Sequence, residues 1–104
     1  MANKNQRDIV IDGRKITVHV LRVRDSAVVE RLRLQAEATP IGDSDEMFMR
    51  TNIYPLLAAC TDGDVPTVDE FLDLPLSDGN LWQETMTQLN PGLYGTTEVA
   101  KKES

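Results

Sequence analysis

Asp12-Gly13 constrains the fold of this chain more than any other pair, because it separates two short stretches in which apolar and polar residues alternate. A type I′ turn requires positive φ at both central positions, and Asp-Gly is one of the pairs that adopts it readily. The apolar positions are Ile9 and Ile11 before the turn, and Ile16, Val18 and Val20 after it. A hairpin of two strands is only marginally stable alone. The pattern therefore predicts an N-terminal antiparallel β-hairpin that packs its apolar face on the rest of the chain.

A helical period follows the hairpin over about residues 26–38. Asp25 or Ser26 is a suitable N-cap for this helix. Pro40 and Gly42 end it, because the residue before a proline avoids helical geometry. The apolar side of the predicted helix consists of Val28, Val29, Leu32 and Ala36.

A second helix is predicted to start at Asp43, with Glu46 completing a capping box. Its apolar surface is wide, which indicates a central helix contacted on two sides. The residues of that surface are Met47, Phe48, Met49, Ile53, Tyr54, Leu56, Leu57 and Cys60. Pro55 lies inside the pattern and removes one backbone donor, so it is predicted to kink the helix or divide it in two.

Residues 61–66 have the composition of a loop. Thr67 and Glu70 form a capping box for a short helix, and Ser77-Asp78 gives the N-cap signal of a last helix. The sequence Asn-Pro-Gly at 90–92 ends that last helix. These patterns predict an α+β fold, in which the N-terminal hairpin packs on a small bundle of three to four helices.

The chain has 104 residues, which is the length of one domain. We predict a single α+β domain over residues 7–91. Residues 1–6 are polar and are predicted to be a flexible N-terminus, and residues 92–104 lack periodicity and are predicted to be a flexible C-terminal tail.

Charge is distributed unevenly along the chain. Residues 1–33 carry eight Lys or Arg against four Asp or Glu, whereas residues 34–100 carry Arg50 alone against twelve acidic residues. Nucleic-acid binding needs clustered Lys and Arg, so the acidic half argues against a nucleic-acid partner. Two interpretations of the acidic surface stay open: it keeps a small protein soluble, or it recognises a basic partner.

The sequence predicts a cytoplasmic protein. Cys60 is the single cysteine and has no partner for an internal disulfide, which is typical of a reducing compartment. The N-terminus lacks the apolar stretch of a secretory signal, and no stretch of the sequence is apolar for long enough to cross a bilayer, so no membrane partner is expected.

Residues suited to catalysis or to metal binding are few. His19 is the only histidine, and its place on a short strand predicts a solvated or edge position rather than a general base or ligand. Cys60 is predicted to be a buried, inert thiol. One histidine and one cysteine cannot form the usual four-ligand zinc site, and a calcium loop counted from Asp62 lacks the required ligands. We therefore expect no catalytic residues, no metal site, no cofactor and no enzymatic activity.

Five large side chains are candidates for partner binding: Met47, Met49, Tyr54, Trp82 and Met86. Their helical spacing is most simply explained by packing in the core. Methionine and aromatic side chains are also adaptable contact residues, and a small domain can leave some of them partly exposed for a partner helix. The sequence is also compatible with self-association.

A longer pattern extends over residues 8–91. Residues 54–61 read Tyr-Pro-Leu-Leu-Ala-Ala-Cys-Thr and lead into an acidic loop. Residues 68–75 then read Val-Asp-Glu-Phe-Leu-Asp-Leu-Pro, and a last helix ends near Asn90. Together with the opening hairpin, this pattern resembles the tail assembly chaperones of long-tailed bacteriophages.

This resemblance implies a protein that binds the long, helical tape measure protein and keeps it soluble while tail-tube subunits polymerise around it. It also implies a longer form made by a translational frameshift, with which the lysine-containing tail is compatible. Such chaperones have no fixed catalytic or ligand positions to transfer. Two other functions stay open from the residues: a small acidic inhibitor that mimics nucleic acid, and a structural connector of the virion.

Overall fold

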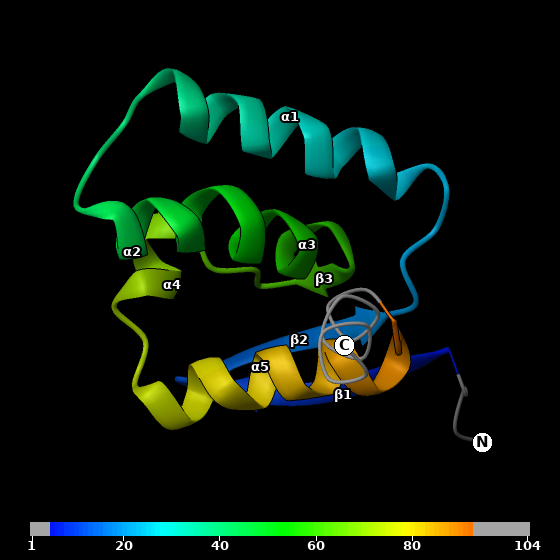
Figure 1. Cartoon of the computed structure of the whole chain (residues 1–104). Helices are drawn as coiled ribbons and strands as arrows, with labels where there is room; N and C mark the ends of the chain where they lie inside the picture. Colours follow the sequence, from blue (N-terminus) through cyan, green and yellow to red (C-terminus); the bar gives the residue numbers. More distant parts are fainter. Residues whose placement is uncertain (1–4, 93–104) are drawn as a thin grey trace, which may run out of the picture.

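The computed structural model describes residues 5–92 and shows an α+β fold, as predicted (Figure 1). In chain order the elements are β1 (Gln6–Ile11), β2 (Arg14–His19), α1 (Asp25–Ala38), α2 (Ser44–Phe48), the π-helix η1 (Met49–Ile53), α3 (Tyr54–Ala59), β3 (Thr61–Gly63), α4 (Val68–Leu72) and α5 (Leu76–Leu89). The predicted tail lies outside the described residues except for Gly92, and so do the first four residues of the predicted flexible N-terminus.

The predicted hairpin is confirmed. β1 and β2 are antiparallel, with Ile9 opposite Ile16 and the turn at Asp12-Gly13. Both turn residues have positive φ, 49° for Asp12 and 79° for Gly13, as a type I′ turn requires. The apolar face of the hairpin is buried, and Ile11, Ile16 and Val18 belong to the core.

A third strand was not predicted. β3 lies within the segment expected to be a loop, and it pairs antiparallel with β2 in a sheet of order β1-β2-β3. The backbone N–H of Asp64 also donates to the carbonyl of Lys15, which extends the pairing. β3 has only three residues, Thr-Asp-Gly, which is too short for an alternating pattern and is made of turn-forming residues. The sequence therefore gives no local signal of it.

The helices form two further layers. Figure 1 shows the α2-η1-α3 segment between α1 on one side and the sheet with α5 on the other, which confirms the predicted central helix. α5 lies along β1 and β2. The fully buried side chains at the centre include Leu57 of α3, Trp82 and Met86 of α5, and Ile11 and Val18 of the hairpin.

Pro55 divides the central helix into the π-helix η1 and the α-helix α3, as predicted. It has no N–H to donate to the carbonyl of Thr51, and its ring would crowd that carbonyl in a regular α-helix. The chain instead widens into the π-helix η1, where the N–H of Tyr54 bonds to the carbonyl of Met49, five residues earlier. Pro55 then occupies the first turn of α3, where a missing donor is tolerated.

The predicted helix starts are partly correct. The capping box of Thr67 and Glu70 is present in full. The side chain of Asp43 accepts from the N–H of Glu46, but the Glu46 carboxylate binds Arg50 instead of completing a box. The N-caps predicted for the first and last helices are wrong. α1 begins at Asp25 without a side-chain cap, and α5 begins at Leu76, after Pro75.

Candidate functional site

The structure places three of the five candidate partner-binding residues in the core. Trp82 and Met86 are fully buried, and Tyr54 is 8% exposed. The rings of Tyr54 and Trp82 lie edge to face, with centroids 6.4 Å apart, and Phe71 packs against both. For Trp82 and Met86 the core interpretation holds, because a fully buried side chain offers no surface to a partner. Tyr54 also packs in the core and keeps a small exposed part. Met47 and Met49 are half-buried and keep some accessible surface.

The polar atoms of the buried aromatic residues are all bonded within the core. The indole N–H of Trp82 donates to the Thr61 hydroxyl at 2.9 Å, and that hydroxyl donates to the Leu57 carbonyl at 2.6 Å. The hydroxyl of Tyr54 donates to the Pro66 carbonyl at 2.6 Å. These bonds connect α5 and α3 to the segment around β3, so they explain the position of the unpredicted third strand.

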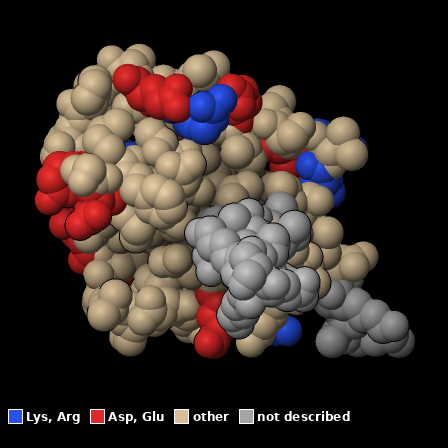
Figure 2. Space-filling model, viewed as in Figure 1, with Lys and Arg blue, Asp and Glu red and all other residues tan. Residues whose placement is uncertain are grey.

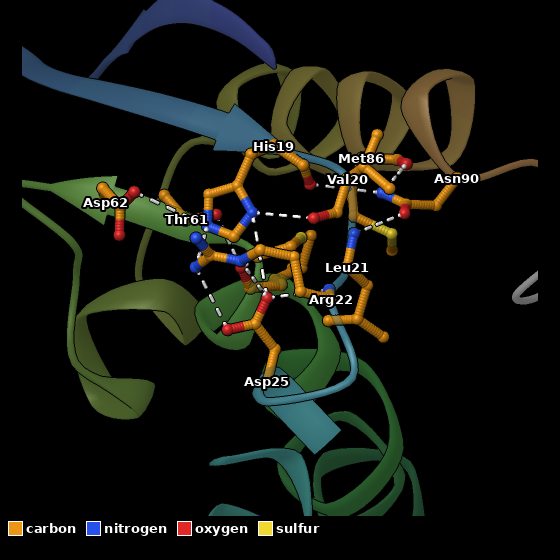
Figure 3. A network of polar contacts seen from close by, with 11 residues as sticks. His19, Val20, Leu21, Arg22, Asp25, Thr61, Asp62, Met86 and Asn90 are labelled. Atoms are coloured by element: carbon orange, nitrogen blue, oxygen red, sulfur yellow. Dashed lines mark hydrogen bonds and ion pairs between the residues drawn. The ribbon is translucent and has the colours of Figure 1, made fainter. Parts of the chain in front are cut away.

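His19 is buried, which corrects the prediction of a solvated or edge position. β2 is the central strand once β3 is added, and the side chains of Arg22 and Asp25 lie beside the imidazole ring (Figure 3). Nδ1 lies 2.9 Å from the carbonyl oxygen of Val20, so Nδ1 carries the proton and donates it. Nε2 faces the carboxylate of Asp62 at 3.6 Å. The ring is therefore held between two strands and a helix.

Asp25 is the residue of α1 that is buried, and it ties the start of α1 to the end of the sheet. Its carboxylate accepts from the backbone N–H of Arg22 at 2.8 Å and from Nε of the same residue at 3.0 Å. It also lies 3.9 Å from Nδ1 of His19. The hydrogen bond from the Arg22 guanidinium is the main reason that the pKa of Asp25 lies below its ordinary value of 3.8.

Asp25 is expected to make folding sensitive to acid. Its lowered pKa means that the folded state favours the carboxylate, so the stabilisation is present above about pH 4 and is lost as the pH falls through the folded pKa. Asp25→Asn should lower the free energy of unfolding by about 1–2 kcal/mol at pH 7, because charge-assisted bonds are lost. Urea unfolding at pH 7 and pH 3 measures the free energy of unfolding of both proteins. The difference between wild type and Asp25→Asn should be smaller at pH 3. Glu84→Gln, an exposed change on α5, is the control, and an equal deficit at both pH values would contradict the account.

Asn90, the residue that follows α5, also makes polar contacts with the chain around His19. Its side-chain oxygen accepts from the N–H of Leu21 at 2.7 Å, and its amide donates to the carbonyls of Met86 at 3.1 Å and His19 at 3.4 Å (Figure 3). The residue predicted to stop the last helix therefore also anchors the chain that leaves β2. A depression of about 290 Å³ opens beside this network, and Asn5, Gln6, His19, Val20, Arg22 and Asp62 line it. The described residues of its lining carry amide, carboxylate, imidazole and guanidinium groups.

Cys60 is fully buried at the end of α3, which confirms the sequence prediction for its burial. Burial raises the pKa of the Cys60 thiol to about 12. The thiol therefore stays protonated at neutral pH, and its S–H points at the Leu57 carbonyl 3.5 Å away. A protonated, enclosed thiol is a weak nucleophile and a poor metal ligand.

An apolar groove lies between α1 on one side and residues of η1, α3 and α4 on the other. We name it the α1–α4 groove, and its main lining residues are Leu32, Ala36, Ile41, Arg50, Tyr54 and Val68. Its volume is about 140 Å³, and most of its accessible surface is apolar. Ile41 is 46% exposed in the turn after α1, and the sulfur of Met47 accepts from its N–H at 3.3 Å. The groove therefore places one predicted candidate, Tyr54, in its wall and another, Met47, beside it.

Arg50 is the charged residue of the groove wall. It is 8% exposed, and its guanidinium binds the Glu46 carboxylate through Nε at 3.0 Å and Nη2 at 2.9 Å. Nη2 also donates to Asp69 at 2.8 Å. One cation thus binds two carboxylates, which joins α2 and η1 to α4 and leaves a net negative charge on this cluster beside the groove.

The sequence patterns do not predict this groove. Ile41 lies between the two residues that end the first predicted helix, and Val68 follows the N-cap of a short predicted helix. Two signals point to the groove in retrospect: a bulky apolar residue between Pro40 and Gly42, and a lone arginine, Arg50, in an otherwise acidic half. Neither signal shows which segments meet, because α1 and α4 are about thirty residues apart in the chain.

Within residues 5–92, no group of three or more His, Cys, Asp or Glu side chains is arranged to hold a metal ion. In the same part of the chain, no helix has the length and apolar character needed to span a bilayer. Comparison of the chain with protein-family models, with curated proteins and with solved structures found no match.

Proposed function

We propose that this chain is a non-enzymatic tail assembly chaperone of a long-tailed bacteriophage, which binds the tape measure protein and keeps it soluble during tail assembly. The α1–α4 groove is the observation that supports this function best. It offers apolar surface on a domain in which two of the other large candidates, Trp82 and Met86, are fully buried in the core. The sequence resemblance supplies the identity of the partner.

A chaperone of this kind must shield apolar stripes of a long helical partner without becoming insoluble itself. The groove gives a small apolar contact, and the surrounding acidic side chains keep the rest of the surface hydrated. Figure 2 shows acidic side chains gathered at the end of the molecule where α2 and α4 lie, beside a largely uncharged surface. Repeated weak contacts of this type along a long partner would add up to firm binding.

Co-expression tests the proposal. The chain should be produced with the long, predominantly helical tape measure protein of the same phage, and the partner's soluble fraction and its recovery with the tagged chain should be measured. We expect the partner to stay soluble and to co-purify, because its apolar stripes are covered. A globular protein of similar size and charge serves as the control. No gain in solubility and no co-purification would show that the chain does not act as this chaperone.

A further inference from the structure

We infer that the α1–α4 groove accepts an amphipathic helix that carries lysine or arginine side chains beside its apolar ones. This inference rests on the proposed function and names the chemistry of the partner segment. It depends on three properties of the described residues: the shape of the groove, the apolar lining and the charge around the mouth.

The lining explains why the occupant is a helix. Leu32, Gln35, Ala36 and Thr39 form one side, and they are spaced i, i+3, i+4 and i+7 along α1 and its end. Arg50 and Tyr54, four residues apart, form the other side. Ridges of this spacing receive side chains that project from another helix at the same intervals. The backbone of both walls is bonded within helices, so the groove has no strand edge to pair with an extended peptide.

The size of the groove sets how the occupant binds. A volume of about 140 Å³ accepts apolar side chains rather than a whole helix. The partner helix therefore lies across the mouth and inserts one or two apolar anchors against Leu32, Ile41 and Val68. Ile41 is nearly half exposed at the mouth, so covering it removes apolar surface from water.

The charges around the groove select a positively charged partner. On the η1 side of the groove, Arg50 is already bound by Glu46 and Asp69. On α1, Arg31 and Arg33 flank Leu32, and Arg33 is paired with Glu30 and Glu37. The side chain of Asp69 is 75% exposed and that of Glu46 is 36% exposed, so both carboxylates keep free lone pairs toward solvent. A lysine or arginine that flanks the apolar anchors can bind there, whereas a glutamate would be repelled.

Two synthetic helical peptides provide the test. One has leucines spaced i, i+3, i+4 and i+7 with lysines at the flanking positions, and its match has glutamates in place of those lysines. Each is titrated into the isotope-labelled full chain, and amide chemical shifts are recorded. We expect the lysine peptide to shift the amides of Leu32, Ala36, Ile41 and Val68. We also expect it to bind about tenfold or more tightly than the glutamate peptide, with the difference shrinking as salt is added.

Variants of the chain locate the binding. Ile41→Asp should weaken binding of the lysine peptide by about tenfold or more, because it places a charge against the apolar anchor of the peptide. Ile41→Ser removes the same contact without adding charge and should weaken binding less. Leu76→Asp is the control, since Leu76 is 78% exposed at the start of α5 and does not line the groove. Circular dichroism verifies that each variant is folded.

Three results would overturn the inference: equal binding of both peptides, wild-type affinity of Ile41→Asp, or shifts confined to another surface. Concentration-dependent shifts of the groove amides without peptide would also overturn it, because they would assign the groove to a second copy of the chain. These outcomes are distinct from failure of the proposed function. A tape measure protein that co-purifies equally with wild type and with Ile41→Asp keeps the chaperone function and rejects the groove.

Discussion

Trp82→Ala should lower the free energy of unfolding by about 3–5 kcal/mol, the range found for the truncation of buried aromatic residues. Trp82 is fully buried, and its ring contacts Tyr54 and Phe71. Truncation leaves a cavity. It also removes the indole N–H that donates a hydrogen bond to the Thr61 hydroxyl. A loss of this size is a large part of the stability of a small domain.

Chemical denaturation followed by circular dichroism measures the effect, because Trp82 is the only tryptophan and its fluorescence disappears with it. Leu81→Ala is the matched control on the same helix, since Leu81 is 38% exposed. It should cost less than about 1 kcal/mol. A loss of under 1 kcal/mol for Trp82→Ala as well would show that Trp82 is not at the centre of the core and is available as a partner contact.

Gly63→Ala should destabilise the fold by about 2–4 kcal/mol. Gly63 has φ of +101°, a conformation that other residues rarely adopt. A Cβ there would lie 2.8 Å from the carbonyl oxygen of Lys15 and 3.3 Å from Cα of Ile16. Both atoms are backbone, so they cannot rotate away, and the pairing of β3 with β2 has to shift.

Gly13→Ala is the control that separates the cost of a left-handed backbone from the cost of steric overlap by the added Cβ. Gly13 also has positive φ, +79°, but a Cβ there would meet no atom within 4 Å. Its replacement should cost only the penalty of a left-handed residue, about 1–2 kcal/mol. Thermal unfolding of both variants gives the comparison. Equal losses would mean that β3 does not lie against Lys15 in solution.

The parts of the fold that the sequence predicts are those with local signals. The Asp12-Gly13 hairpin, the capping box of Thr67 and Glu70 and the interruption at Pro55 depend on residues close together in the chain. Each has a steric or hydrogen-bonding cause that acts whatever the rest of the protein does. The structure confirms all three for that reason.

The parts that the sequence misses depend on long-range contacts. β3 is held by pairing with β2 and by the bond from Trp82 to Thr61, twenty-one residues away. His19 was expected at an edge because the third strand was not predicted, and that strand makes β2 central. Asp25 is one of the two predicted N-caps, with Ser26, but its carboxylate binds the backbone N–H and guanidinium of Arg22 instead. In each case a tertiary contact outweighs the local preference.

In the candidate site, too, the sequence predicts the local features and misses the long-range contacts. The sequence predicted that Met, Tyr and Trp side chains lie in the core or contact a partner, and burial assigns Tyr54, Trp82 and Met86 to the core. The α1–α4 groove needs α1 and α4 to lie together, which no local pattern encodes. Its acidic surroundings were visible in the sequence, but their position around an apolar opening was not.

Hydrogen exchange shows which surface of the chain is covered in the proposed complex with the tape measure protein. Amide exchange of the chain alone is compared with that of the co-purified complex, using mass spectrometry of peptides across residues 5–92. We expect slower exchange in the complex over residues 32–41 and at 68–69, with little change along β1 and β2. Slower exchange confined to the hairpin or to α5, with residues 32–41 unchanged, would contradict it.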